Sequence, residues 1–244
     1  MTIADQPTLL LIHGAWHNKN CWIPLQQELK NLGIPTVAID LPAHGTEPSE
    51  KSLRRYSITD YRQRVENWLA ENDKQPIVPV GHSMGGMIVL DLLKHNPEID
   101  QAILLAPANR AGVWKFLLRL IVRHPLILLK SILTLRLWPV VADTDYAFEL
   151  FYSDQTKMAD VADKLATLQD ESFRVFLDFL LKQPIPQDRD ILLLSGTKDQ
   201  IFAPVNQKAL ASKLKADYVE LAFGHNFFVE DPKQTANEMK NWLD

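Results

Sequence analysis

The sequence predicts an α/β fold: a doubly wound, mostly parallel sheet with a helical cap inserted between two of its strands. Short, continuous apolar runs alternate with segments of helical periodicity along most of the chain. Such runs are typical of strands buried on both faces, as in parallel sheets, and their alternation with helices gives right-handed crossover connections. One long interval breaks the alternation, and this interval is the predicted cap.

Each element of the sheet domain follows from a local pattern. The apolar runs predict six strands, at residues 8–14, 35–42, 76–83, 100–107, 190–196 and 217–224. The helical patterns between and after them cover residues 21–33, 57–72, 84–96, 203–215 and 231–244. A glycine ends the first of these helices, and a Ser or Thr cap starts the second.

The interval from residue 108 to residue 189 contains several helical patterns and no convincing strand. We therefore assign residues 1–107 and 190–244 to an α/β core domain and residues 108–189 to a helical cap subdomain. The prolines of the segment 182–190 suit a stiff return from the cap to the sheet. The cap is expected over the carboxyl ends of the strands, where open α/β sheets bind ligands.

The composition is that of an ordinary globular protein, with 46% hydrophobic and 23% charged residues among 244. The net charge of −4 gives no overall attraction to nucleic acid, so no nucleic-acid partner is expected. The single Cys21 cannot form an intrachain disulfide, and the first residues lack the pattern of a secretory signal, so we expect a cytoplasmic protein. The composition does not specify an oligomeric state.

A glycine-rich turn follows the third predicted strand. Its sequence, Gly81-His82-Ser83-Met84-Gly85, places a serine between a strand and a helix, with glycines two positions away on each side. In a nucleophile elbow, the sharp turn exposes the serine and strains its backbone, and neighbouring backbones pass too closely for side chains. The sequence therefore predicts that Ser83 is a nucleophile.

A serine hydroxyl needs a base, and the base needs an acid that orients it. In folds with this elbow, the order along the chain is Ser, acid, His. Asp199 follows the fifth predicted strand and His225 follows the sixth, so both are expected at the same sheet edge as Ser83. We predict that His225 accepts the Ser83 proton and that Asp199 orients the imidazole. Two alternatives remain open: Asp199 caps the helix that begins near Pro204, and His225 is an ordinary loop histidine.

The transition state also needs N–H donors for the developing oxyanion, each worth about 2.7–4 kcal/mol. One predicted donor is the backbone N–H of Met84, which follows the nucleophile at the start of a helix. The second is expected in the loop after the first strand, at Ala15, with Trp16 as the next candidate.

The sequence resembles the α/β-hydrolase fold superfamily in five motifs that occur in the expected order: LLLIHGAWHNKNCW, AIDLPAHGTEP, VGHSMGG, LLLSGTKDQIFAP and GHNFFVEDP. Its opening HGAWHNKNCW is similar to the esterase and hydroxynitrile lyase branch. The resemblance covers nearly all of the chain outside residues 108–189. It implies a serine hydrolase of carboxylic esters or thioesters, with a sheet that begins at the family's third strand.

Two other functions are compatible with the same residues. Relatives with this triad also act as lyases or acyltransferases, and some hydrolase-fold proteins are small-molecule receptors without significant turnover. The presence of all three triad candidates favours catalysis on a small acyl substrate. No metal-ligand spacing and no phosphate-binding glycine loop occurs in the sequence, so no metal or cofactor is expected.

The predicted cap contains six basic and no acidic residues between Asn109 and Ala142. Lys115, Arg119 and Arg123 recur at every fourth position, which predicts a basic stripe on an amphipathic helix. Such a helix suits weak contact with an anionic membrane surface, or an anionic part of a substrate that also has an apolar acyl chain. The alternative is that the stripe is simply the solvated outer face of the cap.

Aromatic residues beside the catalytic motifs are candidates for an apolar substrate pocket. We assign Trp16, Phe202 and Phe227 to its wall, with the alternative that these side chains belong to the core.

Overall fold

A computed structural model describes residues 6–72 and 76–244 of the chain. The remaining residues, 1–5 and 73–75, belong to the predicted core segment 1–107 and lie outside the described residues. Six strands form one parallel sheet in the order β2-β1-β3-β4-β5-β6. They are β1 (Thr8–Ile12), β2 (Thr36–Ile39), β3 (Ile77–His82), β4 (Gln101–Leu105), β5 (Asp190–Gly196) and β6 (Asp217–Leu221). The predicted fold class and all six strands are confirmed.

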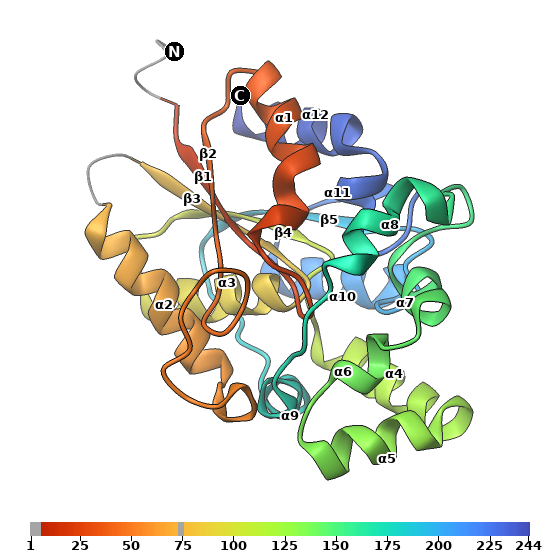
Figure 1. Ribbon diagram of the computed structural model, residues 1–244. Coiled ribbons are helices and arrows are strands. Elements are labelled where there is room, and N and C mark those ends of the chain that lie inside the picture. The colour runs from red at the N-terminus through yellow and green to blue at the C-terminus, as the bar shows by residue number, and fades with distance from the viewer. Residues whose placement is uncertain (1–5, 73–75) are drawn as a thin grey trace.

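Helices cover both faces of the sheet (Figure 1). These helices are α1 (Ile23–Asn31), α2 (Ile58–Glu71), α3 (Met84–His95), α10 (Pro204–Leu214), α11 (Phe227–Glu230) and α12 (Pro232–Leu243). Alternate residues of β1 show the division between the two faces. Leu9 and Leu11 pack in the apolar cluster of α1, α11 and α12, whereas Leu10 and Ile12 pack in the cluster of α2, α3 and α10. Two short 3₁₀ turns, η2 (Lys19–Trp22) and η3 (Leu53–Arg55), precede α1 and α2. The sheet is therefore doubly wound.

The predicted start and stop signals act as expected in the first two helices. Ser57 and Asp60 form a reciprocal capping box at the start of α2. Gly33 follows α1 with a φ of +78°, which a residue without a Cβ adopts readily.

Between β4 and β5, the described chain forms six helices: α4 (Arg110–Arg123), α5 (Pro125–Thr134), α6 (Trp138–Val141), α7 (Thr144–Phe151), α8 (Met158–Ala166) and α9 (Phe173–Leu181). The only strand-like pairing recorded there is an isolated bridge between Arg136 and Ser172. The helices α4, α5 and α6 lie together at one end of the molecule, far from α1 and α12 (Figure 1). The insertion between strands is thus confirmed, and its division at residues 108 and 189 stays a prediction.

None of the helices within residues 6–72 and 76–244 is both long and apolar enough to cross a membrane.

Candidate active site

Ser83 lies on the sharp turn between β3 and α3. Its φ of +52° and ψ of −113° are strained for a residue with a side chain. The Ser83 N–H donates to Leu105 O over 2.9 Å, and Ser83 O accepts from Ala108 N over 2.8 Å, so neighbouring backbone holds the turn. A Cβ added to Gly85 would collide with the carbonyl oxygen of Ile12. The turn therefore has the geometry expected for a nucleophile elbow.

His225 and Asp199 are joined by a buried hydrogen bond. His225 Nδ1 lies 2.7 Å from Asp199 Oδ2. The other carboxylate oxygen, Oδ1, accepts from the backbone N–H groups of Ile201 and Phe202 over 2.7 and 2.8 Å. Asp199 is not the cap of α10, because the N-cap residue there is Ala203 and makes no side-chain cap bond. The carboxylate is therefore fixed on both sides, and the Nε2 atom of His225 is the nitrogen left for chemistry.

The loop of His225 lies against the elbow. His82, the residue before Ser83, donates from Nε2 to the carbonyl oxygen of His225 over 3.2 Å, and the two imidazole centroids are 4.7 Å apart. The hydrogen bonds described for the His225 ring reach Asp199 and not the Ser83 hydroxyl. Resting active sites commonly have long or poorly aligned contacts that tighten with substrate. The structure thus brings the three predicted residues to one edge of the sheet, and their catalytic roles stay predictions.

The loop after β1 lies beside the nucleophile. A Cβ added to Gly14 would lie 3.1 Å from the Ser83 Cβ. Across the part of the chain that is described, the backbone N–H groups of Ala15 and Met84 have no hydrogen-bond acceptor. Met84 is the first residue of α3, where backbone N–H groups have no partner within the helix. Both predicted oxyanion donors are therefore available near Ser83.

Trp16, the alternative oxyanion candidate, connects the β1 loop to the cap. Its indole N–H donates to Leu137 O over 3.1 Å, and its carbonyl accepts from Gln169 N over 2.7 Å. Its φ of +65° is unusual for a large side chain. We infer that these cap contacts hold the conformation of Trp16.

Two further histidines hold the active-site loops together, and the sequence analysis did not assign them this role. His17 donates from Nδ1 to Ala15 O over 2.8 Å and accepts at Nε2 from Asn226 over 3.2 Å. It thereby joins the β1 loop to the residue after His225, as His82 joins the elbow to the same loop. Burial lowers the pKa of His17 to about 4 and holds the pKa of His82 well below its usual value. Both histidines are neutral and position the loops around them. Their places beside the HGAW and GHSMG motifs were the sequence signal that could have indicated this role.

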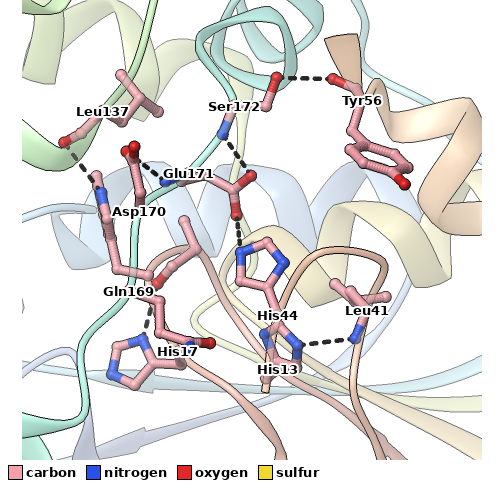
Figure 2. Close-up of polar contacts among 12 residues, drawn as sticks. His13, His17, Leu41, His44, Tyr56, Leu137, Gln169, Asp170, Glu171 and Ser172 are labelled. Atoms are coloured by element: carbon pink, nitrogen blue, oxygen red, sulfur yellow. Dashed lines mark hydrogen bonds and ion pairs between the residues drawn. The ribbon is translucent and has the colours of Figure 1, made fainter. Parts of the chain in front are cut away.

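A buried ion pair joins the cap to the sheet domain (Figure 2). His44, in the loop after β2, places Nε2 3.1 Å from Glu171 Oε2, and neither side chain is exposed. Glu171 Oε1 accepts from the Tyr61 hydroxyl over 2.8 Å and from Ser172 N over 2.7 Å. Although burial opposes the charge of His44, the carboxylate of Glu171 raises the pKa of the imidazole above its usual value. The sequence analysis interpreted His44 only as a turn residue.

The three predicted pocket residues lie in different places. Trp16 borders a small apolar cavity of about 20 Å³ beneath α4 and α5, with Phe116, Leu120, Leu128, Ser131, Leu137, Val140, Phe173 and Phe176. The Phe202 ring is 5.4 Å from the His225 ring. The assignment of Phe227 to the pocket was wrong: it is fully buried in the cluster with Trp22 and Met239. The reason is α11, which turns Phe227 onto the face covered by α1 and α12.

The three residues of the predicted basic stripe of α4 differ in exposure: Lys115 and Arg123 are exposed, and Arg119 is half-buried. Lys115 donates to Asn206 of α10 over 3.0 Å. Arg119 lies over the Phe116 ring and borders a cavity of about 810 Å³ between α4, α7 and the loop that carries Asp199. Among the described residues, its Nε and Nη2 atoms are buried without a hydrogen-bond partner. Burial lowers the pKa of the Arg119 guanidinium, and the negative charge of Asp199 is near enough to oppose that shift.

The parallel sheet, the elbow at Ser83 and the helices inserted after β4 define the class of α/β hydrolase folds. Consistent with this class, residues 9–238 match the alpha/beta hydrolase family, so the chain belongs to that family. The predicted resemblance is confirmed.

Two curated relatives illustrate the family. Phospholipase YtpA of Bacillus subtilis (strain 168) is 33% identical over 112 residues, which cover 43% of this chain and 42% of the relative. Salicylic acid-binding protein 2 of Nicotiana tabacum is 33% identical over 100 residues, which cover 40% of this chain and 38% of the relative. The matches therefore span less than half of each relative's length.

Among solved structures, an extracellular alpha/beta-hydrolase from a Paenibacillus species superimposes with a TM-score of 0.73. The match covers 96% of this chain and 98% of that chain at 17% sequence identity. At this identity the likeness shows the fold. The family match and its phospholipase relative support hydrolase activity.

Proposed function

We propose that this protein is a serine hydrolase that cleaves a carboxylic ester or thioester through Ser83, His225 and Asp199. The observation that carries the proposal is the Asp199–His225 hydrogen bond at the sheet edge beside the strained Ser83 turn. Because Nδ1 faces the carboxylate, Nε2 is the imidazole atom that serves as base.

The geometry gives each residue a step. His225 Nε2 takes the proton of the Ser83 hydroxyl as Oγ attacks the acyl carbon, while Asp199 stabilises the imidazolium. The N–H groups of Ala15 and Met84 donate to the oxyanion of the tetrahedral intermediate. His225 then returns the proton to the leaving oxygen or sulfur, which departs and leaves an acyl-Ser83 ester. Water, deprotonated by His225, attacks the acyl carbon of this ester. The bond to Oγ then breaks, the proton on His225 passes to Ser83 Oγ, and the carboxylic acid is released.

The surroundings support a substrate with an apolar acyl part. The cavity beside Trp16 is lined almost entirely by apolar side chains and lies next to the loop that carries Ala15. Its volume of about 20 Å³ is smaller than an acyl chain, so binding requires α4 or α5 to move outward. Trp16 and Phe202 are the proposed contacts, since Phe202 lies against His225.

Arg119 supports an anionic group elsewhere on the same substrate. Two nitrogens of the Arg119 guanidinium, Nε and Nη2, are buried without a partner among the described residues, which is costly unless a ligand supplies the acceptor. The Tyr146 hydroxyl, also buried and unpartnered among the described residues, borders the same cavity as Arg119. A carboxylate or phosphate placed there would accept from both side chains.

A fluorophosphonate probe tests the proposed chemistry. We expect covalent labelling of the folded protein at Ser83, located by peptide mapping, and no labelling of Ser83→Ala. Ser195→Ala is the matched control, because Ser195 is a buried serine of β5 whose hydroxyl is paired with Tyr218. Labelling at another residue, or none in folded wild type, would contradict the proposal. Labelling without hydrolysis of any ester would instead favour a lyase, an acyltransferase or a receptor.

Substrate charge tests the role of Arg119. We compare the p-nitrophenyl ester of butyric acid with the mono-p-nitrophenyl ester of glutaric acid, which carries a free carboxylate. Arg119→Gln should raise KM for the anionic ester at least about tenfold, the effect of one charged hydrogen bond, and leave KM for the neutral ester within about twofold. Arg174→Gln, an exposed position in α9, is the control. If Arg119→Gln changed KM equally for both esters, the proposal that the substrate carries an anionic group would be wrong.

A further inference from the structure

Exposed apolar side chains are concentrated on α4, α5 and the turn that follows. Fourteen large hydrophobic residues are exposed among those described, and ten of them fall between residues 114 and 138. These ten are Trp114, Leu118, Ile121, Val122, Leu126, Leu129, Ile132, Leu133, Leu135 and Trp138, and we call them the α4–α5 face. Such a concentration of exposed apolar side chains is unusual on a monomeric protein and indicates a site of interaction.

The α4–α5 face is additional to the surface that attaches these helices to the protein. In α4, Val113, Phe116 and Leu120 are buried, whereas Leu118 and Val122 on the other side are 60% and 70% exposed. In α5, most residues are apolar, yet the buried residue is Ser131. Packing of the cap therefore does not explain why these positions are apolar.

The segment that carries this face has charged side chains of one sign, although the carboxylate of Asp170 contacts it at Arg136. The segment from Asn109 to Ala142 contains no acidic residue. Arg123, at the end of α4, and Lys130, in α5, are exposed and have no ion-pair partner within the described chain. Arg136 forms an ion pair with Asp170 but stays 57% exposed. An apolar face is thus bordered by cationic side chains.

We propose that the α4–α5 face docks on the surface of an anionic lipid bilayer. The apolar side chains would enter the boundary between headgroups and acyl chains, and Arg123 and Lys130 would lie at the level of the anionic headgroups. The 14-residue α4 and the 10-residue α5 are too short to span a bilayer and suit an orientation parallel to its surface.

Charge favours a bilayer over a second copy of this chain. A symmetric dimer through the α4–α5 face would place like patches opposite each other, so that Arg123 and Lys130 of both copies would share one interface without carboxylates from this segment. Anionic headgroups provide the complementary charge, and the acyl region accepts apolar side chains of any arrangement.

Docking would also bring lipid close to the proposed active site. Leu120 of α4 and Leu128 of α5 border the small cavity on the side opposite to the α4–α5 face, and Trp16 borders the same cavity. One layer of helices, about 10 Å thick, would therefore separate the bilayer from the loop that carries Ala15. A substrate with an apolar acyl chain would have a short path from the membrane.

Vesicle flotation tests the proposal independently of the chemistry. The protein used is Ser83→Ala, which leaves the surface unchanged and prevents turnover of lipid. We expect binding to vesicles of phosphatidylcholine with phosphatidylglycerol at least about tenfold stronger than to phosphatidylcholine alone. Binding should weaken as salt concentration rises.

Two double variants separate the apolar and charged contributions. Leu126→Gln with Leu133→Gln should weaken binding at least about tenfold, through loss of two buried side chains. Arg123→Gln with Lys130→Gln should weaken binding to anionic vesicles about 30-fold at low salt, at about fivefold per cation. The matched control combines Ile23→Gln and Lys30→Gln in α1, at the far end of the molecule (Figure 1).

Three results would overturn the proposal. They are absence of binding to either vesicle, binding that both double variants leave unchanged, and a dimer in sedimentation equilibrium that Leu126→Gln with Leu133→Gln dissociates. The last result would assign the α4–α5 face to self-association. None of them depends on whether Ser83 reacts with a fluorophosphonate, so the two proposals fail separately.

Discussion

The sheet domain and the cap place their apolar side chains differently. In the sheet domain, strands and helices bury them against each other, and the large side chains of β1, β3 and β4 are almost entirely inaccessible. In the cap, α4 and α5 bury one side and leave a second apolar side exposed. The sheet domain thus buries its apolar side chains within itself, whereas the cap leaves an apolar side exposed, for which we propose a bilayer as the partner.

The two regions also differ in how histidines are used. Around the elbow, His13, His17 and His82 are buried and neutral, and their ring nitrogens form hydrogen bonds that fix loops. At the cap junction, the Glu171 carboxylate raises the pKa of His44 although burial opposes the charge. The loops near Ser83 are therefore fixed by neutral imidazoles, whereas the contact between the cap and the sheet domain pairs an imidazole with a carboxylate.

The largest expected effect lies in the sheet domain, at Asp199. In Asp199→Asn, the side-chain oxygen can still accept from Ile201 and Phe202, so the amide nitrogen faces His225 Nδ1 and imposes the wrong tautomer. We expect kcat on a p-nitrophenyl ester to fall about 10⁴-fold with little change in KM. Asp143→Asn is the control, because Asn and Asp cap α7 equally well. Near-normal turnover of Asp199→Asn would show that another group orients the histidine.

The next largest effect is expected at the cap junction, in Glu171→Leu. Removing the carboxylate leaves His44 and the Tyr61 hydroxyl buried without their acceptor, which should lower the free energy of unfolding by about 3–5 kcal/mol at pH 6. The pKa of His44 is raised in the folded protein. The ion pair therefore contributes its full amount to the free energy of unfolding below about pH 6.5, the pKa of an unfolded histidine. This contribution is lost as pH rises through the pKa of His44 in the folded protein.

Urea unfolding at several pH values measures this effect. The difference between wild type and Glu171→Leu should shrink as pH is raised above about 6.5. Asp163→Leu, which removes the carboxylate of an exposed ion pair in α8, should cost less than about 1 kcal/mol. A difference that is constant with pH would mean that His44 is neutral in the folded protein.

The neutral histidines of the sheet domain predict a pH dependence of the opposite sign. Burial lowers the pKa of His13 to about 3 and that of His17 to about 4, so unfolding below about pH 6.5 takes up protons that the folded protein does not bind. Stability therefore falls as pH decreases from 6.5, by up to about 1.4 kcal/mol per pH unit for each histidine.

His17→Asn removes one of the histidines that take up a proton on unfolding. Near pH 5, the slope of unfolding free energy against pH should be smaller than in wild type by about 1.4 kcal/mol per pH unit. His95→Asn, at the half-exposed end of α3, is the control and should leave the slope nearly unchanged. Equal slopes for wild type and His17→Asn would show that His17 is protonated in the folded protein.

The sequence predicted those parts of the site that follow from backbone geometry. Strand ends fix where Ser83, Asp199 and His225 meet, and the glycines of the elbow are required by close approach of main chains, so a local pattern was sufficient. The pairing of His44 with Glu171 joins residues that are 127 positions apart, and no local pattern indicates it. Phe227 was misplaced because it begins α11, a four-residue helix after His225 that packs against α1 and α12.

The cap was predicted less completely for a related reason. Helical periodicity showed that α4 is amphipathic, but α4 has two apolar sides, and only tertiary structure shows which one packs inward. The basic stripe was therefore expected at the surface, and Lys115 and Arg123 are exposed there, whereas Arg119 is half-buried beside the large cavity.

The smallest effect is expected for a leucine on the α4–α5 face. Leu133 is 74% exposed, so Leu133→Gln should change the free energy of unfolding in solution by less than about 0.5 kcal/mol. Leu193→Ala in β5, where the side chain is fully buried, should cost about 2–5 kcal/mol. Denaturant unfolding of both variants measures the contrast between the two regions directly. If Leu133→Gln destabilised the protein as strongly as Leu193→Ala, Leu133 would serve the fold, and its exposure would no longer require a membrane or any other partner.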